Sequence, residues 1–253
     1  MLKITDVNAD TWISILSKLG IPLVLVYVYF MFIAPFFKGD WNYVLNVWHN
    51  WQSLNVGILA FISSLIAFNI SRYNSDKQRQ REFIASRAFL PNALSLLSDY
   101  TKQSAELLKE SWNIKNDWNG SSTITLQSNL PKVDSSINKV FAECIRHGSP
   151  EVAENLATIL VKLQVNDSRL TSLFEGNIRH LNHQNLRVYM YCLGEIKALV
   201  DSLFTFARGR EKFIVPELSL SALHTAYLNL EIHEEFVEGL SELTEKMLSN
   251  ENA

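Results

Sequence analysis

The sequence predicts an all-α protein in which an N-terminal transmembrane hairpin of two helices precedes a cytoplasmic helical domain. Two long segments near the N-terminus carry no charged residue, and nearly all of the charge lies beyond residue 71. Farther along the chain, apolar residues recur at spacings of three and four, the period of an amphipathic helix. The single candidate for extended structure is Lys212–Val215, a segment of four residues.

Composition excludes several classes of protein. The 253 residues are 47% hydrophobic and 19% charged, and they include only 2 Cys and 9 Gly. This composition differs from that of disordered chains, collagens and disulfide-rich secreted domains. The net charge of -3 argues against direct binding of nucleic acid.

The first predicted span is residues 19–37, a run of 19 residues without a charged side chain. At ~1.5 Å per residue, a helix of this length crosses the ~30 Å hydrocarbon core of a bilayer. Pro22 and Pro35 lie near its two ends, where a missing backbone donor disturbs a helix least. A cleaved secretory signal is the alternative, but the run is long for one, and Pro35 follows Ala34 where a small-residue cleavage site is needed.

The second predicted span is residues 51–71, a run of 21 uncharged residues that is less apolar than the first. Between the spans lies a short connector, residues 38–50, with the aromatic side chains Trp41, Tyr43 and Trp48. Such side chains are typical of a membrane–water boundary. The two spans are therefore expected to form a hairpin.

Cationic residues gather directly after the second span. Under the positive-inside rule, this excess of Lys and Arg places both termini of a multi-pass protein in the cytoplasm. The cations are expected to lie against anionic lipid headgroups, or else to set the topology only. This basic collar consists of Arg72, Lys77, Arg79, Arg81 and Arg87.

Two faces of the second span differ in composition. Asn55 and Asn69 lie on one side, where an amide that faces lipid is costly. The other side carries a stripe of small side chains, which lets another helix approach closely. If the stripe packs on the first helix, the Asn face is left for a neighbouring copy or for water; alternatively, both Asn lie at headgroup depth. The small-residue stripe is Gly57, Ala60, Ser64, Ala67 and Ser71.

The chain beyond residue 71 divides into a juxtamembrane helix (72–111), a loop rich in Asn, Ser, Thr and Gly (112–131) and a helical domain (132–253). No Gly or Pro interrupts residues 58–90, so the second span is expected to continue as one helix to Pro91 and to kink or restart there. A stripe typical of a helix that packs on helices follows: Leu90, Leu94, Leu97, Thr101, Ser104 and Leu108.

Several helices are expected in the C-terminal domain. Ser149-Pro150-Glu151 is a helix start signal, with a capping residue, a proline in the first turn and an early acid. The expected ranges are 133–147, 150–163 with a continuation or restart near 167, 186–208, and one or two helices within 219–248. The last range carries a short heptad seam of Phe236, Leu240, Leu243 and Met247.

Motifs for catalysis, cofactors and metals are missing from the sequence. The glycines are scattered singly, so the chain has no phosphate-binding loop, dinucleotide-binding motif or nucleophile elbow. Cys144 and Cys192 lack the spacing of a thiol metal site, and no disulfide is expected on the reducing side of a membrane. His180 and His183 have a metal-binding spacing without a clear third ligand. We expect no catalytic residue, no cofactor and no metal.

One segment carries a resemblance to known proteins. It is Arg87-Ala88-Phe89-Leu90-Pro91-Asn92-Ala93-Leu94-Ser95-Leu96-Leu97-Ser98-Asp99-Tyr100, preceded by the span that Trp51-Gln52 opens. Residues 51–108 resemble a large, mostly uncharacterised group of bacterial inner-membrane proteins. These proteins share a membrane segment followed by an R-A-x-L-P-x-A-L-S-x-L-x-x-Y helix.

The two-helix architecture is also similar to that of membrane effectors in bacterial anti-phage systems, including retrons. This similarity implies a non-enzymatic, toxin-like protein that is held inactive until infection is sensed and then damages the inner membrane, as in abortive infection. It also implies a cytoplasmic partner, in retrons a reverse transcriptase with its nucleic acid, which restrains oligomerisation. A hairpin with a small-residue face and an amide face is able to self-associate.

The competing interpretation is a non-enzymatic scaffold or sensor that is anchored in the membrane and presents a helical interaction domain. The two interpretations predict different effects of Asn55→Leu and Asn69→Leu. An effector should lose toxicity with these changes, whereas a scaffold should tolerate them.

Overall fold

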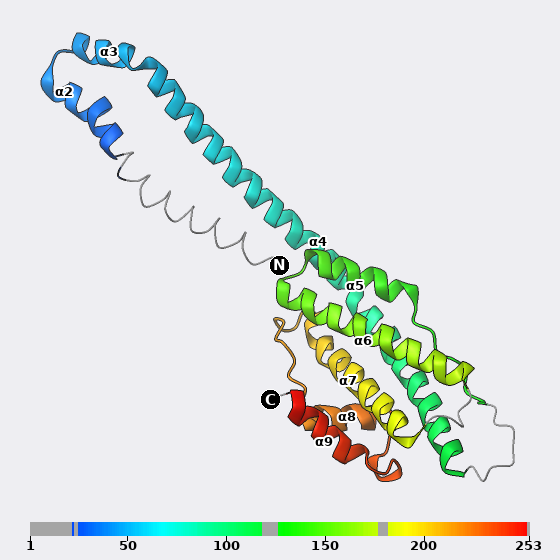
Figure 1. Ribbon diagram of the computed structural model, residues 1–253. Coiled ribbons are helices and arrows are strands. Elements are labelled where there is room, and N and C mark those ends of the chain that lie inside the picture. Colours follow the sequence, from blue (N-terminus) through cyan, green and yellow to red (C-terminus); the bar gives the residue numbers. More distant parts are fainter. Residues whose placement is uncertain (1–21, 23–24, 118–125, 177–181, 252–253) are drawn as a thin grey trace. The chain divides into compact units, whose positions relative to one another are not determined.

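The computed structural model describes residues 22, 25–117, 126–176 and 182–251, and the chain separates into two compact units, Met1–Asn74 and Ser75–Ala253 (Figure 1). The regular structure in these described residues is helical throughout, which confirms the all-α prediction. Lys212–Val215, the expected extended segment, forms neither a strand nor a helix.

The first unit contains short helical elements and the start of a very long helix. The π-helical turn η1 (Tyr29–Ile33) leads into α2 (Ala34–Lys38), and α3 (Trp41–Asn50) follows. The connector predicted at 38–50 is thus mostly helix. The indole Nε1 of Trp48 donates to the backbone oxygen of Met31 at 3.0 Å, which ties α3 to η1.

One described helix, α4 (Gln52–Asp117, 66 residues), is long and apolar enough to cross a membrane. None of its apolar window is buried inside the protein. The segment 25–38 is a shorter apolar helix. Of the two predicted spans, the structure therefore supports the second, and it does not show the two-helix hairpin. Residues 19–21, 23 and 24 of the first predicted span lie outside the described residues.

The second unit is a bundle in which α7 occupies the central position. This helix packs against α6, α8 and α9, and α5 packs against α6 (Figure 1). The predicted ranges agree with the helices to within a few residues, and α6 continues through Asp167 without a restart. The elements after α4 are α5 (Ser135–His147), α6 (Pro150–Glu175), α7 (His183–Ala207), α8 (Leu220–Asn229), η3 (Glu234–Phe236) and α9 (Leu240–Glu251).

Local sequence signals explain where these helices begin and end. The carboxylate of Asp134 accepts a hydrogen bond from the backbone N–H of Ser136 at 2.7 Å, at the start of α5. Asn182 and Ser219 cap α7 and α8 in the same way. Each cap satisfies a backbone donor that has no partner within the helix. After α7 the chain turns at Gly209, whose φ of 70° favours a residue without a Cβ atom.

The stripe predicted for residues 90–108 faces the core of the second unit. All six of its side chains, from Leu90 to Leu108, are 0% exposed, which confirms the pattern. Helix α4 passes through Pro91 without interruption and ends at Asp117, so residues 112–117 of the predicted loop (112–131) are helical instead. The reason is burial: Trp112 is 4% exposed, and its indole Nε1 donates to the backbone oxygen of Phe236 at 3.1 Å.

The heptad seam predicted in the C-terminal tail is wrong at its first position. Leu240 is buried in the core, and Leu243 and Met247 pack against it. Phe236, however, is 74% exposed and belongs to η3. The chain turns at Gly239, where φ is 79°, so Phe236 is not on the same helix as the other three residues.

Two charged side chains of α7 are buried in the bundle. Glu195 is 3% exposed, and the ammonium of Lys162 lies 3.0 Å from its Oε2. Lys197 is 5% exposed, and its ammonium contacts Asp201 Oδ1 at 2.5 Å and donates to Ser98 Oγ at 3.0 Å. Buried charges are destabilising unless they are paired. The Lys162–Glu195 pair therefore joins α7 to α6, and the hydrogen bond from Lys197 to Ser98 joins α7 to α4.

Glu110 holds the chain that enters α5. Its two carboxylate oxygens accept hydrogen bonds from the backbone N–H groups of Gln127 at 2.5 Å and Ser128 at 2.8 Å. Partial burial raises the pKa of Glu110, but these hydrogen bonds lower it by more, so the net pKa lies below its ordinary value. A lowered pKa means that the carboxylate stabilises the fold above the unfolded-state pKa and loses this effect as the pH falls through the folded-state pKa.

We therefore expect Glu110→Gln to lower the free energy of unfolding by about 1 kcal/mol at pH 7, because a charged acceptor for two backbone donors is lost at a partly exposed site. The difference from the unsubstituted protein should shrink as the pH falls below about 4. Urea denaturation of the full chain in detergent at both pH values measures this. Glu106→Gln, at an exposed position one turn earlier, is the control and should have little effect at either pH.

Candidate functional site

The amide of Asn55 faces another helix of the first unit. Its Oδ1 accepts a hydrogen bond from the hydroxyl of Tyr27 at 2.8 Å, and both residues are half-buried. Tyr27 lies on the apolar segment 25–38. A polar group in apolar surroundings is stabilised by such a partner. The side of α4 that carries Asn55 is therefore the side that meets the preceding apolar helix.

The small-residue stripe has the opposite environment. Gly57, Ala60, Ser64 and Ala67 are all exposed, and a Cβ atom at Gly57 would have no atom within 4 Å. The Ser64 hydroxyl donates to the backbone oxygen of Ala60 at 2.9 Å, so it is satisfied within its own helix. From the sequence we considered that the small-residue stripe packs on the first helix and leaves the Asn face free. The structure shows the opposite at Asn55: this residue contacts the preceding helix, and the stripe is exposed.

Asn69 does not share the environment of Asn55. It is exposed, and the structure gives its side chain no hydrogen bond to a described residue. The two amides predicted to act together thus differ: one is bound to Tyr27 and the other is open to the surroundings of α4.

The residues of the basic collar lie in two different environments. Arg72, Lys77, Arg79 and Arg81 are exposed, and the guanidinium of Arg72 lies 6.0 Å from the centre of the Phe68 ring. Arg87 is half-buried between two aromatic rings of the second unit, 5.9 Å from the centre of Phe83 and 5.6 Å from that of Phe206. Phe206 lies on α7, so Arg87 helps to pack α4 against the bundle.

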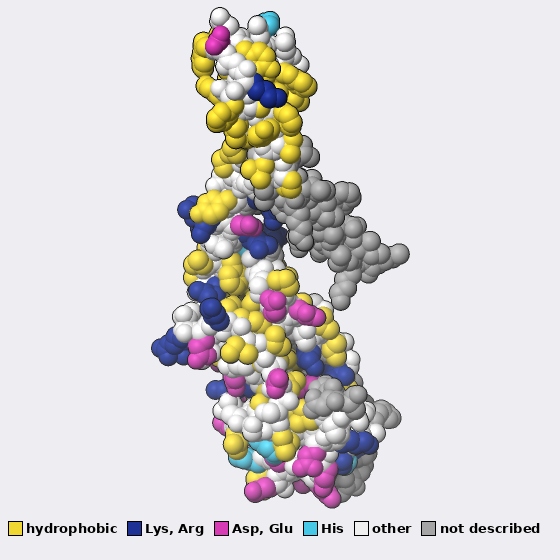
Figure 2. Space-filling model, turned by 90° about the vertical axis from the view of Figure 1, so that its left-hand side faces the viewer, with side chains coloured by type: hydrophobic (Ala, Val, Ile, Leu, Met, Phe, Trp, Pro, Cys, Tyr) yellow, Lys and Arg dark blue, Asp and Glu magenta, His cyan; other side chains and the backbone are white. Residues whose placement is uncertain are grey.

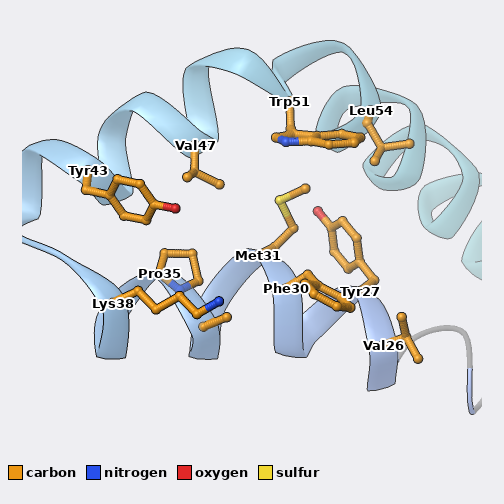
Figure 3. A pocket seen from close by; sticks show the side chains of 11 residues that line it. Val26, Tyr27, Phe30, Met31, Pro35, Lys38, Tyr43, Val47, Trp51 and Leu54 are labelled. Carbon is orange, nitrogen blue, oxygen red and sulfur yellow. The ribbon is translucent and has the colours of Figure 1, made fainter.

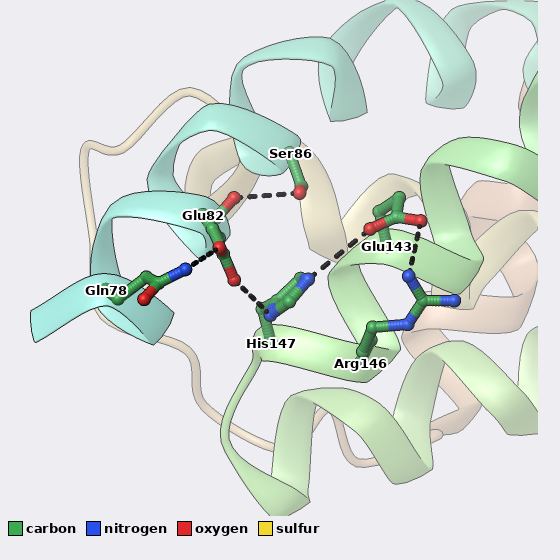
Figure 4. Close-up of polar contacts among 6 residues, drawn as sticks. All are labelled: Gln78, Glu82, Ser86, Glu143, Arg146 and His147. Atoms are coloured by element: carbon green, nitrogen blue, oxygen red, sulfur yellow. Dashed lines mark hydrogen bonds and ion pairs between the residues drawn. The ribbon is translucent and has the colours of Figure 1, made fainter. Parts of the chain in front are cut away.

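A polar cluster that the sequence did not reveal joins α5 to α4 in the second unit (Figure 4). The His147 ring lies between two carboxylates, with Nδ1 3.1 Å from Glu82 Oε2 and Nε2 3.4 Å from Glu143 Oε2. Gln78 donates to Glu82 at 2.9 Å, and Arg146 lies 3.1 Å from Glu143. A protonated imidazole carries an N–H on each side and binds both carboxylates, whereas a neutral ring donates to one only.

The cysteines have the environments of structural residues. Cys144 is 0% exposed, and burial together with the nearby Glu143 charge raises the pKa of its thiol to about 11, against a smaller opposite effect of Arg87. Burial also raises the pKa of Cys192, although the guanidinium of Arg169 donates to its Sγ at 3.1 Å. Both thiols are free.

The described residues contain no group of three or more side chains placed to hold a metal ion. His183 instead contacts Asn116 Oδ1 through Nε2 at 2.9 Å, and its ring lies edge-on to Trp112. His180, the other histidine of the predicted pair, lies outside the described residues.

The surface of the described residues separates into two chemical types (Figure 2). Hydrophobic side chains gather over the first unit, and charges of both signs are mixed over the second. No protein-family model matches the chain, and no curated protein or solved structure matches it.

Proposed function

We propose that this protein is a membrane effector of a bacterial anti-phage system of the retron type, which perturbs the inner membrane once a cytoplasmic partner releases it. The exposed apolar part of α4 is the observation that carries the proposal. Nearly every side chain from Gln52 to Ser71 is exposed, including large ones such as Leu59, Phe61 and Phe68. Exposure of so much apolar surface to water is strongly unfavourable, whereas hydrocarbon accommodates it.

In this proposal the membrane part is a hairpin of two spans, about 19–37 and 51–71, with both termini in the cytoplasm. Three features of the first unit support it. The segment 25–38 is helical and apolar, Tyr27 joins it to Asn55, and α3 between the spans carries Trp41, Tyr43 and Trp48. The aromatic residues suit the membrane–water boundary, and the cations after Ser71 suit the cytoplasmic side.

Self-association through the small-residue stripe would then produce the membrane damage. The stripe is exposed, and small side chains let helices of neighbouring copies approach closely. The helical domain would bind a protein partner, in the retron case a reverse transcriptase with its nucleic acid, and would restrain assembly until infection. The action is mechanical, so it requires no catalytic residue and no direct contact between this chain and nucleic acid.

A scaffold or sensor anchored in the membrane is the second candidate. It is favoured by large apolar side chains that are exposed on the second unit, namely Leu228 at 66%, Phe236 at 74% and Ile214 at 79%. Exposed apolar groups of this size are common at protein–protein contacts. On this interpretation the apolar helices serve as an anchor only.

The deciding experiment is induction of the full chain in bacteria beside a Ser75–Ala253 fragment, with membrane potential and growth as readouts. The effector proposal expects rapid loss of potential with the full chain and normal potential with the fragment. Ala60→Leu with Ala67→Leu should restore the potential by blocking close helix contact. Ile66→Phe with Ile70→Phe, at exposed positions off the stripe, is the control and should remain toxic.

If both chains leave the potential normal, phage challenge with the native gene neighbours present separates the candidates. Protection that requires the small residues of the stripe supports the effector. Protection that survives Ala60→Leu with Ala67→Leu, or no protection at all, rejects it.

A further inference from the structure

We propose that an anionic phospholipid binds in the first unit, in a pocket between the apolar segment 25–38 and the α3–α4 region, with its phosphate on Lys38. The inference rests on the membrane location proposed above and adds a specific ligand to it. The pocket has a volume of about 470 Å³, within the range of ~300–1,000 Å³ usual for ligand sites.

The one charged side chain of the pocket lining, Lys38, lies at one end of the pocket (Figure 3). Lys38 and Tyr43 bring their polar atoms to that end, beside Pro35, while Tyr27 and Trp51 flank the other end. The remaining lining is hydrocarbon, thioether and aromatic ring: Val26, Phe30, Met31, Ala34, Val47 and Leu54. This arrangement suits an amphiphile that has a charged head and a long apolar tail.

The head of that amphiphile should be anionic. Lys38 is the one charged residue of the lining, and it takes part in none of the ion pairs formed by the described residues. A phosphate beside its ammonium would gain a charge-assisted hydrogen bond, and the Tyr43 hydroxyl is available at the same end as a second donor.

A second pocket accounts for the second acyl chain of a phospholipid. It has a volume of about 530 Å³ and shares Tyr27 and Met31 with the first. Its other lining residues include Trp48, Val56 and Ile62, and no charged side chain. The two pockets therefore offer neighbouring apolar space for two tails, with one cation for one headgroup.

The surroundings favour a lipid over a soluble ligand. Large apolar side chains beside the pocket are exposed, among them Phe30 at 61%, Phe36 at 58% and Phe37 at 86%. In water these rings would make the site a point of aggregation, whereas in a bilayer they contact the same acyl chains that enter the pocket. Lys38 lies next to the aromatic residues of α3, which prefer headgroup depth.

The test is native mass spectrometry of the full chain, purified in detergent and incubated with phosphatidylglycerol or phosphatidylcholine of the same chain length. We expect one bound lipid per chain. Phosphatidylglycerol should be preferred about fivefold, which is the gain in affinity expected from one cation beside an anionic headgroup. Lys38→Gln should abolish the preference but retain binding of both lipids. Lys77→Gln, a cation outside the pocket, should keep the preference.

A filling variant tests the pocket itself. Ala34→Trp should reduce retention of both lipids at least tenfold, while circular dichroism shows unchanged helix content. Glycerol phosphate, which has the head without the tails, should not compete with phosphatidylglycerol at equal concentration. Lipid retention that is indifferent to both Lys38→Gln and Ala34→Trp would overturn the inference, as would competition by glycerol phosphate.

Cell fractionation keeps the two proposals apart. Recovery of the full chain in the soluble fraction rejects the membrane effector and the lipid site together. Recovery in the membrane fraction without selective lipid retention rejects the lipid site alone.

Discussion

Replacement of Gly194 by leucine is expected to destabilise the helical domain severely. Gly194 is buried in α7, and a Cβ atom there would lie 2.4 Å from Cε1 and 3.1 Å from Cδ1 of the Tyr227 ring on α8. The ring has little freedom to move, because Tyr227 is 1% exposed and its hydroxyl shares a hydrogen bond of 2.9 Å with Thr244. Overpacking by one or two methylenes destabilises a core by ~1–3 kcal/mol, and leucine adds four carbons.

We therefore expect a loss of about 4 kcal/mol or more, a large part of the ~5–15 kcal/mol by which a domain is stable. Gly194→Ala should be milder, at about 1 kcal/mol, because the clash is offset by the greater helix propensity of alanine. Thermal and urea denaturation of the full chain in detergent measure both. Gly57→Ala is the control, since its Cβ atom would meet nothing within 4 Å. A normal melting temperature for Gly194→Leu would contradict the packing described between α7 and α8.

Removal of Asp201 is expected to be more damaging than removal of its buried partner, Lys197. Asp201→Ala leaves the Lys197 ammonium, whose side chain is 6% exposed, with Ser98 as its remaining hydrogen-bond partner. Such an uncompensated buried charge destabilises by ~3–5 kcal/mol, and the 31% exposure of the Asp201 side chain reduces our expectation to about 2 kcal/mol. Lys197→Met removes the charge itself and should alter stability by less than about 1 kcal/mol.

The double variant gives the sharper result. Lys197→Met should rescue most of the loss caused by Asp201→Ala, since no buried charge then remains at the site. Part of the loss should persist because Asp201 also accepts a hydrogen bond of 3.0 Å from Asn229. Urea denaturation at pH 7 provides the four free energies of the cycle. Additive losses in the double variant would show that the Lys197–Asp201 contact is of no consequence.

The parts of the fold that sequence predicted well are those set by local pattern. The stripe from Leu90 to Leu108 repeats over several turns, so its burial follows from helical geometry alone. Ser149 followed by Pro150 fixes the start of α6 in the same local way. The wrong predictions concern features that depend on contacts between residues far apart in the sequence. Helix α4 extends past Trp112 because its indole reaches the backbone of Phe236, which is 124 positions away.

Several contacts of the candidate site could not be predicted from the local sequence either, because they join residues that are far apart in the chain. Composition distinguishes the small-residue face of α4 from its Asn face. It does not show which of the two faces contacts the preceding apolar helix. That depends on the hydroxyl of Tyr27, which lies 28 positions before Asn55. Arg87 was assigned to the basic collar because of its position in the sequence. Its contact with Phe206 could not be predicted in this way, because Phe206 belongs to a different helix, α7. The carboxylates on both sides of His147 also come from different helices, α4 and α5.

The buried Cys144 thiol is a natural probe of how often the helical domain opens. Thiolate is the form that reacts with maleimides and disulfide reagents, and a pKa of about 11 leaves very little of it at neutral pH. With 0% exposure, the thiol also has no direct access to a reagent. Its labelling rate should therefore report how often α5 leaves the core. The opening of the helical domain can thus be timed in the full chain without the introduction of a foreign probe.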